Sequence, residues 1–133
     1  RPLVAINDAG AIPYFSAWRG LDLWGLNDPT IALHGKHEPA YSDYILGQNP
    51  DLVVLGSTSP TEYKPTFSWE PGLYRRCMQT GMKCVKVATY LPEVYYLWLL
   101  ARPGSPVAAY VARWRQELHP VTGVERGKPP GSP

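Results

Sequence analysis

The chain has 133 residues, which is enough for one domain with a substantial core and too few for two. With 44% hydrophobic and 18% charged residues its composition is globular, and a net charge of +2 without a basic block interleaved with aromatic residues excludes a nucleic-acid partner. Its longest apolar stretch, Val94 to Ala101, is much shorter than the ~20 residues of a membrane-spanning helix, so we expect no such helix here. Since Arg1 stands where an initiator methionine is expected, we interpret the sequence as a piece of a longer protein.

The first elements predicted along the chain are a strand, a turn, a helix and a second strand. The apolar run 3–6 is typical of a strand buried on both faces, and the polar turn that follows it leads into a helix over 9–18. Asp8 is placed to cap that helix, because its carboxylate can accept the unpaired N–H groups of the first turn. The second strand is predicted over 21–24.

The next elements are two helices and a strand. Asp28 as a cap and Pro29 at the first helical position predict a short helix, which ends before a polar loop at 34–39. A second helix is predicted over 41–48, followed by an apolar strand over 51–55. Helix followed by buried strand, twice over, is typical of α/β folds with parallel strands and right-handed crossovers.

A long loop is predicted from Gly56 to Pro71, which contains three Pro, three Ser and three Thr. Loops of this length in compact domains are often functional. Its aromatic residues Tyr63, Phe67 and Trp69 either pin the loop to the body of the domain or present a surface to a ligand; Tyr63 and Trp69 are the candidate glycan contacts.

The second half of the chain is predicted to end the sheet and cover it. We expect a helix over 73–80 closed by Gly81, a hairpin-like pair of strands, a helix from Pro106 to about Leu118, and a Gly- and Pro-rich tail. The strands of the pair span 85–90 and 94–100. The domain therefore covers 1–119, and residues 120–133 form a flexible or extended tail.

Together these elements predict a three-layer α/β domain. Its sheet is small, mostly parallel and Rossmann-like, with helices on both faces and a hairpin at one edge.

Few residues are arranged for known chemistry. The turn after the first strand contains only Gly10 of the three glycines that a dinucleotide fingerprint requires, and no Gly-Lys-Ser/Thr is present, so we predict no cofactor. Asp8 and Asp22 are expected at the carboxyl edge of parallel strands, where two carboxylates could perform acid–base work or hold a cation. The alternative, which we favour, is that Asp8 and Asp28 cap helices while Asp22 pairs with Arg19 or a backbone N–H.

Metal and thiol chemistry are also weakly indicated. His34 and His37 lie three residues apart beside Glu38, but no third ligand stands at a recognised spacing, so no metal site is predicted. Cys77 and Cys84 are either free or joined in one disulfide, and no serine stands in a Gly-x-Ser-x-Gly elbow.

Three segments carry a family resemblance: DAGAIPYFS from Asp8, DLWGLND from Asp22, and NPDLVVL from Asn49, preceded by Tyr44-Ile-Leu. They resemble the soluble domain that follows the last membrane helix in bacterial GT-C-type polytopic glycosyltransferases of the arabinofuranosyltransferase and mannosyltransferase kind. The resemblance covers about the first half of the chain; from Gly56 onward only the order of elements is similar.

The resemblance implies an extracytoplasmic, periplasmic-face domain that rests on the transmembrane part of the same polypeptide. That part transfers a sugar from a polyprenyl-phosphate donor and, in this family, holds the catalytic acid, so the domain itself is not expected to be catalytic. Its partners would be the transmembrane part and a glycan or lipid-linked sugar. The residues that match the motif would be architectural or would line a ligand edge: Asp8, Gly10, Tyr14, Asp22, Gly25 and Asp28.

Two other hypotheses remain open. The chain could be a small soluble α/β enzyme that uses Asp8 and Asp22, which requires both carboxylates in one cleft. It could also be a protein-interaction module, which requires an exposed apolar patch.

Overall fold

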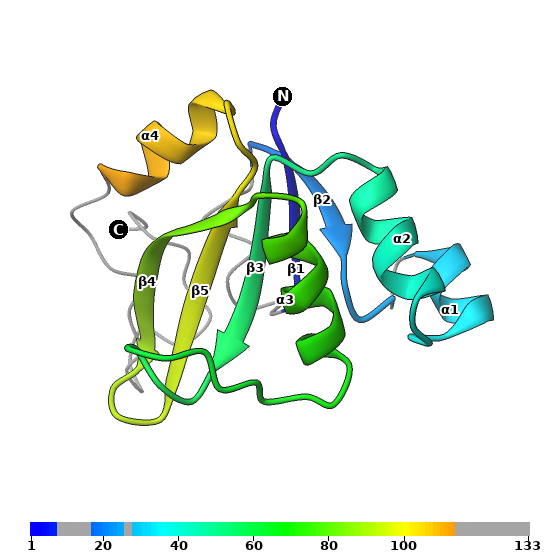
Figure 1. The fold of residues 1–133 in the computed structure, drawn as a ribbon, viewed down its shortest axis with the longest axis horizontal. Coiled ribbons are helices and arrows are strands. Elements are labelled where there is room, and N and C mark those ends of the chain that lie inside the picture. Colours follow the sequence, from blue (N-terminus) through cyan, green and yellow to red (C-terminus); the bar gives the residue numbers. More distant parts are fainter. Residues whose placement is uncertain (8–16, 26–27, 114–133) are drawn as a thin grey trace, which may run out of the picture.

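The computed structural model describes residues 1–7, 17–25 and 28–113, and these form an α/β domain (Figure 1). A five-stranded sheet has the strand order β2-β1-β3-β5-β4, and four helices belong to the described part. The strands are β1 (Leu3–Ile6), β2 (Arg19–Asp22), β3 (Leu52–Ser57), β4 (Lys83–Leu91) and β5 (Tyr95–Ala101). The helices are α1 (Pro29–His34), α2 (Ala40–Gly47), α3 (Glu70–Gln79) and α4 (Pro106–Ala112).

The sheet is mixed, with its parallel pairs at one end. β1 pairs in parallel with both β2 and β3, whereas β5 is antiparallel to β3 and to β4. The predicted hairpin is confirmed, because the short turn between β4 and β5 can join only antiparallel strands. Parallel pairing is thus confined to β2, β1 and β3. β5 lies between β3 and β4 and is antiparallel to both.

Among the described strands, the hairpin's outer strand, β4, pairs with β5 alone. Its pairing with β5 shifts register twice, between Cys84 and Lys86 and between Thr89 and Leu91. Such bulges bend a strand and interrupt its hydrogen-bond ladder.

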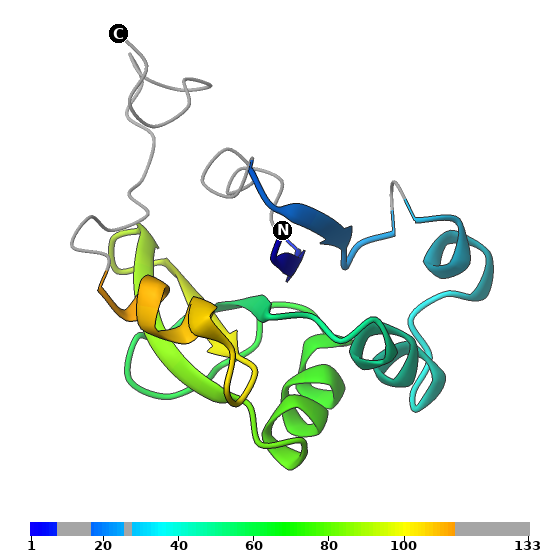
Figure 2. The ribbon, with the colours of Figure 1, turned by 90° about the horizontal axis from the view of Figure 1, so that it is seen from above.

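Both faces of the sheet are covered by helices, as the alternation of buried residues shows. The cluster on one face joins the sheet to α1, α2 and α3 and consists of Leu3, Ala5, Leu21, Leu23, Ile31, Tyr41, Ile45, Val53, Leu55, Leu73, Cys77, Met82 and Leu100. The cluster on the other face joins the sheet to α4 and consists of Val4, Ile6, Leu52, Val54, Ala88, Leu97, Leu99, Ala101, Val107 and Val111. Figure 2 shows α4 apart from the other three helices.

The helix starts show which local predictions succeed. Asp28 caps α1 by accepting from the N–H groups of Thr30 and Ile31, as predicted. α3 begins at Glu70, earlier than the predicted Leu73, because the turn before it is closed by the Glu70 side chain. Gly81 follows α3 with φ +87°, in agreement with its predicted role as the end of that helix.

Other boundaries differ from the predictions. β2 spans Arg19–Asp22 rather than 21–24, because Trp24 N–H bonds to the Asp22 side chain and closes a turn there. The helix predicted over 9–18 lies mostly outside the described residues, and residues 17–18 form a turn and a bend.

α4 differs from its prediction at its end. It ends at Ala112, and the predicted end at Leu118 and the tail lie outside the described residues. Val107 and Val111 are buried, whereas Tyr110 is 52% exposed, because a two-turn helix buries only the narrow face of its i and i+4 positions.

None of the helices described here combines the length and the apolar composition needed to cross a bilayer.

Candidate functional site

The parallel strands β1, β2 and β3 run downwards in Figure 1, so their carboxyl ends lie along one edge of the sheet. Ile6 is paired with Asp22 and with Val54, so the residues that follow these strands are neighbours. The turn between β4 and β5 lies at the same edge, because Ser57 is paired with Tyr96. In open α/β sheets ligands bind outside the carboxyl ends of strands where the crossovers diverge, here between β1 and β3. We call this the carboxyl edge.

A buried carboxylate, Glu70, joins three segments at this edge. Its Oε2 accepts hydrogen bonds from Asn7 Nδ2 at 2.8 Å and from Gly56 N at 3.0 Å. Its Oε1 accepts from Thr66 N at 3.0 Å, Thr66 Oγ1 at 2.8 Å and Phe67 N at 2.8 Å. Glu70 therefore holds the end of β1, the end of β3 and the loop before α3 together.

The environment of Glu70 fits a structural clamp better than a general base. The residue is 0% exposed, and burial raises the pKa of its carboxyl above the ordinary value against the opposing effect of the hydrogen bonds from Thr66, Phe67 and Gly56. Both oxygens already accept from protein donors. A substrate proton would have to displace one of these bonds.

Asn7 brings an unused acceptor to the same place. Its side chain is buried, and Oδ1 has no hydrogen-bond partner among the described residues although Nδ2 donates to Glu70. Sequence reasoning missed both Asn7 and Glu70. The available signal was the pair Glu70-Pro71 shortly before the start of the predicted helix, since acidic residues and proline are common in the first turn of helices.

An aromatic cluster flanks the carboxyl edge beyond β2. The ring of Trp24 meets those of Phe67 and Trp69 edge to face, with centroid distances of 4.7 and 5.6 Å. Trp69 in turn meets Tyr41, whose hydroxyl donates to the Leu23 carbonyl. We call Trp24, Phe67 and Trp69 the aromatic platform. Its exposed member is Trp24, with 36% of its surface accessible.

Three predicted motif residues are described, and all three shape turns. Asp22 Oδ1 accepts from Trp24 N at 2.9 Å, which confirms the backbone N–H alternative. Asp28 caps α1 and also accepts from Tyr44 Oη at 2.8 Å. Gly25 has φ +82°, and a Cβ there would collide with Ile31. Asp8, Gly10 and Tyr14 lie outside the described residues, so their predicted roles remain predictions.

The loop residues Tyr63 and Trp69 both pack against the core, as the pinning alternative predicts. Tyr63 stacks on Tyr74 with ring centroids 4.2 Å apart and meets Trp98 edge to face. The loop itself is shorter than predicted, since β3 extends to Ser57 and α3 begins at Glu70. A glycan contact of Tyr63 or Trp69 remains a prediction.

The cysteines are both free, which answers the question that the sequence left open. Cys77 is buried in the core, and burial raises the pKa of its thiol to about 12, so it is not a nucleophile at neutral pH. Within the described ranges no three His, Cys, Asp or Glu side chains come together as metal ligands.

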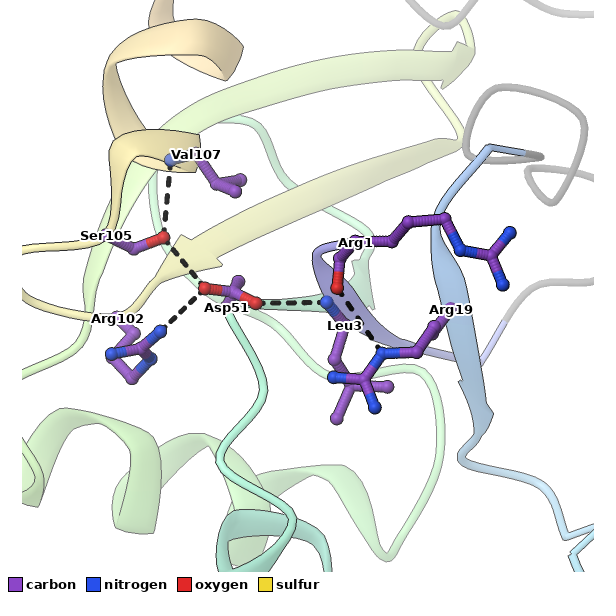
Figure 3. Close-up of polar contacts among 7 residues, drawn as sticks. All are labelled: Arg1, Leu3, Arg19, Asp51, Arg102, Ser105 and Val107. Atoms are coloured by element: carbon purple, nitrogen blue, oxygen red, sulfur yellow. Dashed lines mark hydrogen bonds and ion pairs between the residues drawn. The ribbon is translucent and has the colours of Figure 1, made fainter.

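The opposite edge of the sheet has a clamp of its own, built on Asp51 (Figure 3). Its Oδ2 accepts from Leu3 N at 3.0 Å, and its Oδ1 accepts from Arg102 Nη2 at 2.6 Å and Ser105 Oγ at 3.0 Å. Ser105 also caps α4 by accepting from Val107 N. We call this the amino edge.

The pKa of Asp51 is shifted in the direction opposite to that of Glu70. Partial burial alone would raise it, but the hydrogen bonds from Leu3, Arg102 and Ser105 and the charge of Arg102 outweigh burial and hold the pKa below its ordinary value. Asp51 is therefore ionised at neutral pH and ties β1, β3 and the start of α4 together.

The comparison with known families gives one match. Residues 2–98 match the family described as "Domain of unknown function (DUF8728)". This range includes Glu70, the aromatic platform and both edges up to Trp98. No curated protein and no solved structure matches the chain.

Proposed function

This chain belongs to the family of the domain of unknown function (DUF8728), and we propose that it is an extracytoplasmic accessory domain of a membrane glycosyltransferase. The enzyme would transfer a sugar from a polyprenyl-phosphate donor. In this proposal the domain assists recognition of a glycan or lipid-linked sugar and leaves the chemistry to the transmembrane part of the same polypeptide. The observation that carries the proposal is the resemblance of the segments that begin at Asp8, Asp22 and Asn49.

The geometry of the motif residues supports this division of labour. In the resemblance these residues are mainly architectural, and Asp22, Gly25 and Asp28 do form a turn and a helix cap. The one fully buried carboxylate at the carboxyl edge, among the residues that the structure describes, has both oxygens occupied by protein donors. A supporting role in ligand recognition therefore fits these residues better than catalysis.

We also infer that β2, β1 and β3 form a Rossmann-like half-sheet. The inference is supported by their order, their parallel pairing and the crossover from β2 to β3 through α1 and α2. The antiparallel pair β4 and β5 would then be an extension of this half rather than its second repeat.

The test uses the full-length protein in its membrane. We expect several segments of ~20 apolar residues upstream of Arg1, and we expect sugar transfer from a polyprenyl-phosphate donor to fall when residues 1–133 are deleted. Membrane insertion of the shortened protein, followed by fractionation, is the control. A full-length protein without apolar segments, or a correctly inserted deletion variant with unchanged transfer, would contradict the proposal.

A further inference from the structure

Trp24 is the most solvent-exposed ring of the aromatic platform. It follows β2 directly, and 36% of its surface is accessible. Phe67 and Trp69 are half-buried, and their ring planes are nearly parallel, with an interplanar angle of 2°. An exposed tryptophan supported by two other rings offers a large apolar area that contributes strongly to binding.

The position of Trp24 is fixed from both sides. Asp22 Oδ1 accepts from its backbone N–H, and Gly25 after it is confined by Ile31. Trp69, which supports its ring, contacts the buried Tyr41. A ring held in this way loses little conformational freedom when a ligand binds.

A positive charge lies over the face of this ring. Lys36, in the loop that follows α1, places its Nζ 5.0 Å from the centroid of the Trp24 ring. The ion pairs found in the described part of the chain join Arg76 to Asp43 and Arg102 to Asp51, so neither engages Lys36.

Since no carboxylate of the described residues lies within ion-pair distance of Lys36, its ammonium can pair with an external anion.

The geometry points to a binding site for a sugar phosphate, with the ring of Trp24 packed against the sugar and Lys36 paired with the phosphate. Sugar rings carry faces of C–H groups that pack on aromatic rings, and a lysine ammonium binds phosphate as a point charge. The flexible stem of Lys36 lets the ammonium leave the ring face while staying beside it. This inference rests on the proposed function and names its ligand class, which includes free sugar phosphates and lipid-linked ones.

The test follows the Trp24 indole N–H signal by NMR in the 133-residue chain during titration with mannose 1-phosphate. We expect a saturable shift with a dissociation constant on the order of 1 mM, as for a ligand of this size with few contacts. Mannose and inorganic phosphate, titrated separately, should each bind at least about tenfold more weakly, since each makes only one of the two contacts.

Two variants assign the contacts. Because Trp24→Ala lacks the reporting signal, both variants are followed through the indole N–H of Trp69, whose ring contacts that of Trp24. Trp24→Ala should weaken binding of mannose 1-phosphate about tenfold, and Lys36→Met should weaken it to the level of mannose alone. Tyr110→Ala is the matched control, because Tyr110 is an exposed aromatic residue on α4, which covers the other face of the sheet. Lys36 lies in a loop outside both core clusters, so its variant tests the site even if Trp24→Ala disturbs the fold.

The same titration with an alkyl phosphomannose in micelles distinguishes the sources. Binding at least tenfold tighter than that of mannose 1-phosphate supports a lipid-linked ligand, and equal binding supports a free one. The inference is overturned by unchanged affinity in both variants, by equal binding of inorganic phosphate, or by no shift at tens of millimolar. None of these results alters the deletion experiment on the full-length protein, so the two proposals fail separately.

Discussion

Each of the two edges of the sheet is held by a carboxyl side chain, Asp51 at the amino edge and Glu70 at the carboxyl edge. The two carboxyl groups differ in their burial and in the charge of their hydrogen-bond donors. Asp51 at the amino edge has a cationic partner and a side chain that is 17% exposed. Glu70 at the carboxyl edge is 0% exposed and accepts, among the described residues, from amide and hydroxyl groups without a cation. At Asp51 the hydrogen bonds and the charge of Arg102 outweigh burial, so its pKa is lowered. At Glu70 burial outweighs the hydrogen bonds, so its pKa is raised.

The two carboxyl groups therefore connect the elements around them in two different ways. At the amino edge a charge pair near solvent fixes the first residues of β1 to the start of α4. At the carboxyl edge a desolvated carboxylate fixes three segments at once, so each of its donors would be left buried if it were lost. The carboxyl edge should therefore be the more sensitive of the two.

The largest effect is expected from Glu70→Gln. An amide would place an NH₂ group among N–H and O–H donors at one of the two oxygen positions, and breaking a buried network of this kind costs about 3–5 kcal/mol of unfolding free energy. Chemical denaturation measures the change. Glu62→Gln, at an exposed position of the same loop, is the control and should change stability by less than about 0.5 kcal/mol. Equal stability of the two variants would remove Glu70 as the clamp.

A glycine pair compares the backbone of the two edges. Gly25 and Gly104 both have positive φ, of 82° and 75°, but only Gly25 has a neighbour, Ile31, where a Cβ would stand. We expect Gly25→Ala to cost about 2–3 kcal/mol and Gly104→Ala about 1 kcal/mol, the strain of the left-handed conformation alone. Thermal and chemical unfolding of both variants provide the comparison. A larger cost at Gly104 would contradict the collision with Ile31.

A smaller effect is expected at the amino edge itself. Asp51→Asn keeps one acceptor for Leu3 or Arg102 but loses the ion pair, and a partly solvated pair contributes about 1–2 kcal/mol with its hydrogen bonds. Asp43→Asn, which removes the more exposed pair with Arg76, is the control, expected below about 1 kcal/mol. A cost for Asp51→Asn that matches Glu70→Gln would erase the contrast between the edges.

The smallest effect is a difference in pH dependence. The lowered pKa of Asp51 contributes stability above its unfolded value near 3.8, and this stability is lost as the pH falls through the folded pKa. The raised pKa of Glu70 contributes stability below its unfolded value near 4.5, and this stability is lost as the pH rises through the folded pKa. The cost of Asp51→Asn should thus shrink from pH 7 to pH 3, while that of Glu70→Gln should grow. Denaturation curves between these limits measure both, and parallel slopes would contradict the assignment.

Features encoded by neighbouring residues were predictable from the sequence. Asp28 followed by Pro29 predicts the start of α1, and the apolar run at 52–55 predicts β3. The short spacing between the segments 85–90 and 94–100 predicts a hairpin. Each depends on contacts within a few residues, which propensity and capping describe well.

Features encoded by distant residues were not predictable. The donor Asn7 is 63 residues away from its acceptor Glu70, and Arg102 is 51 residues away from Asp51. The position of β5 between β3 and β4 likewise depends on the whole sheet. Trp24 was predicted inside a strand and is instead the exposed residue of a turn, because a short apolar run of four residues does not locate the end of a strand.

The interrupted outer strand has a consequence for self-association. A second copy that added itself to β4 would need an unbroken ladder, whereas the register shifts at Cys84/Lys86 and Thr89/Leu91 leave only short regular stretches. Lys83 at the start of the strand adds a charge that repels an identical partner. The side of β4 that pairs with no other described strand is therefore a poor template for pairing with a second molecule, which favours a chain that stays monomeric at the concentrations of an NMR titration.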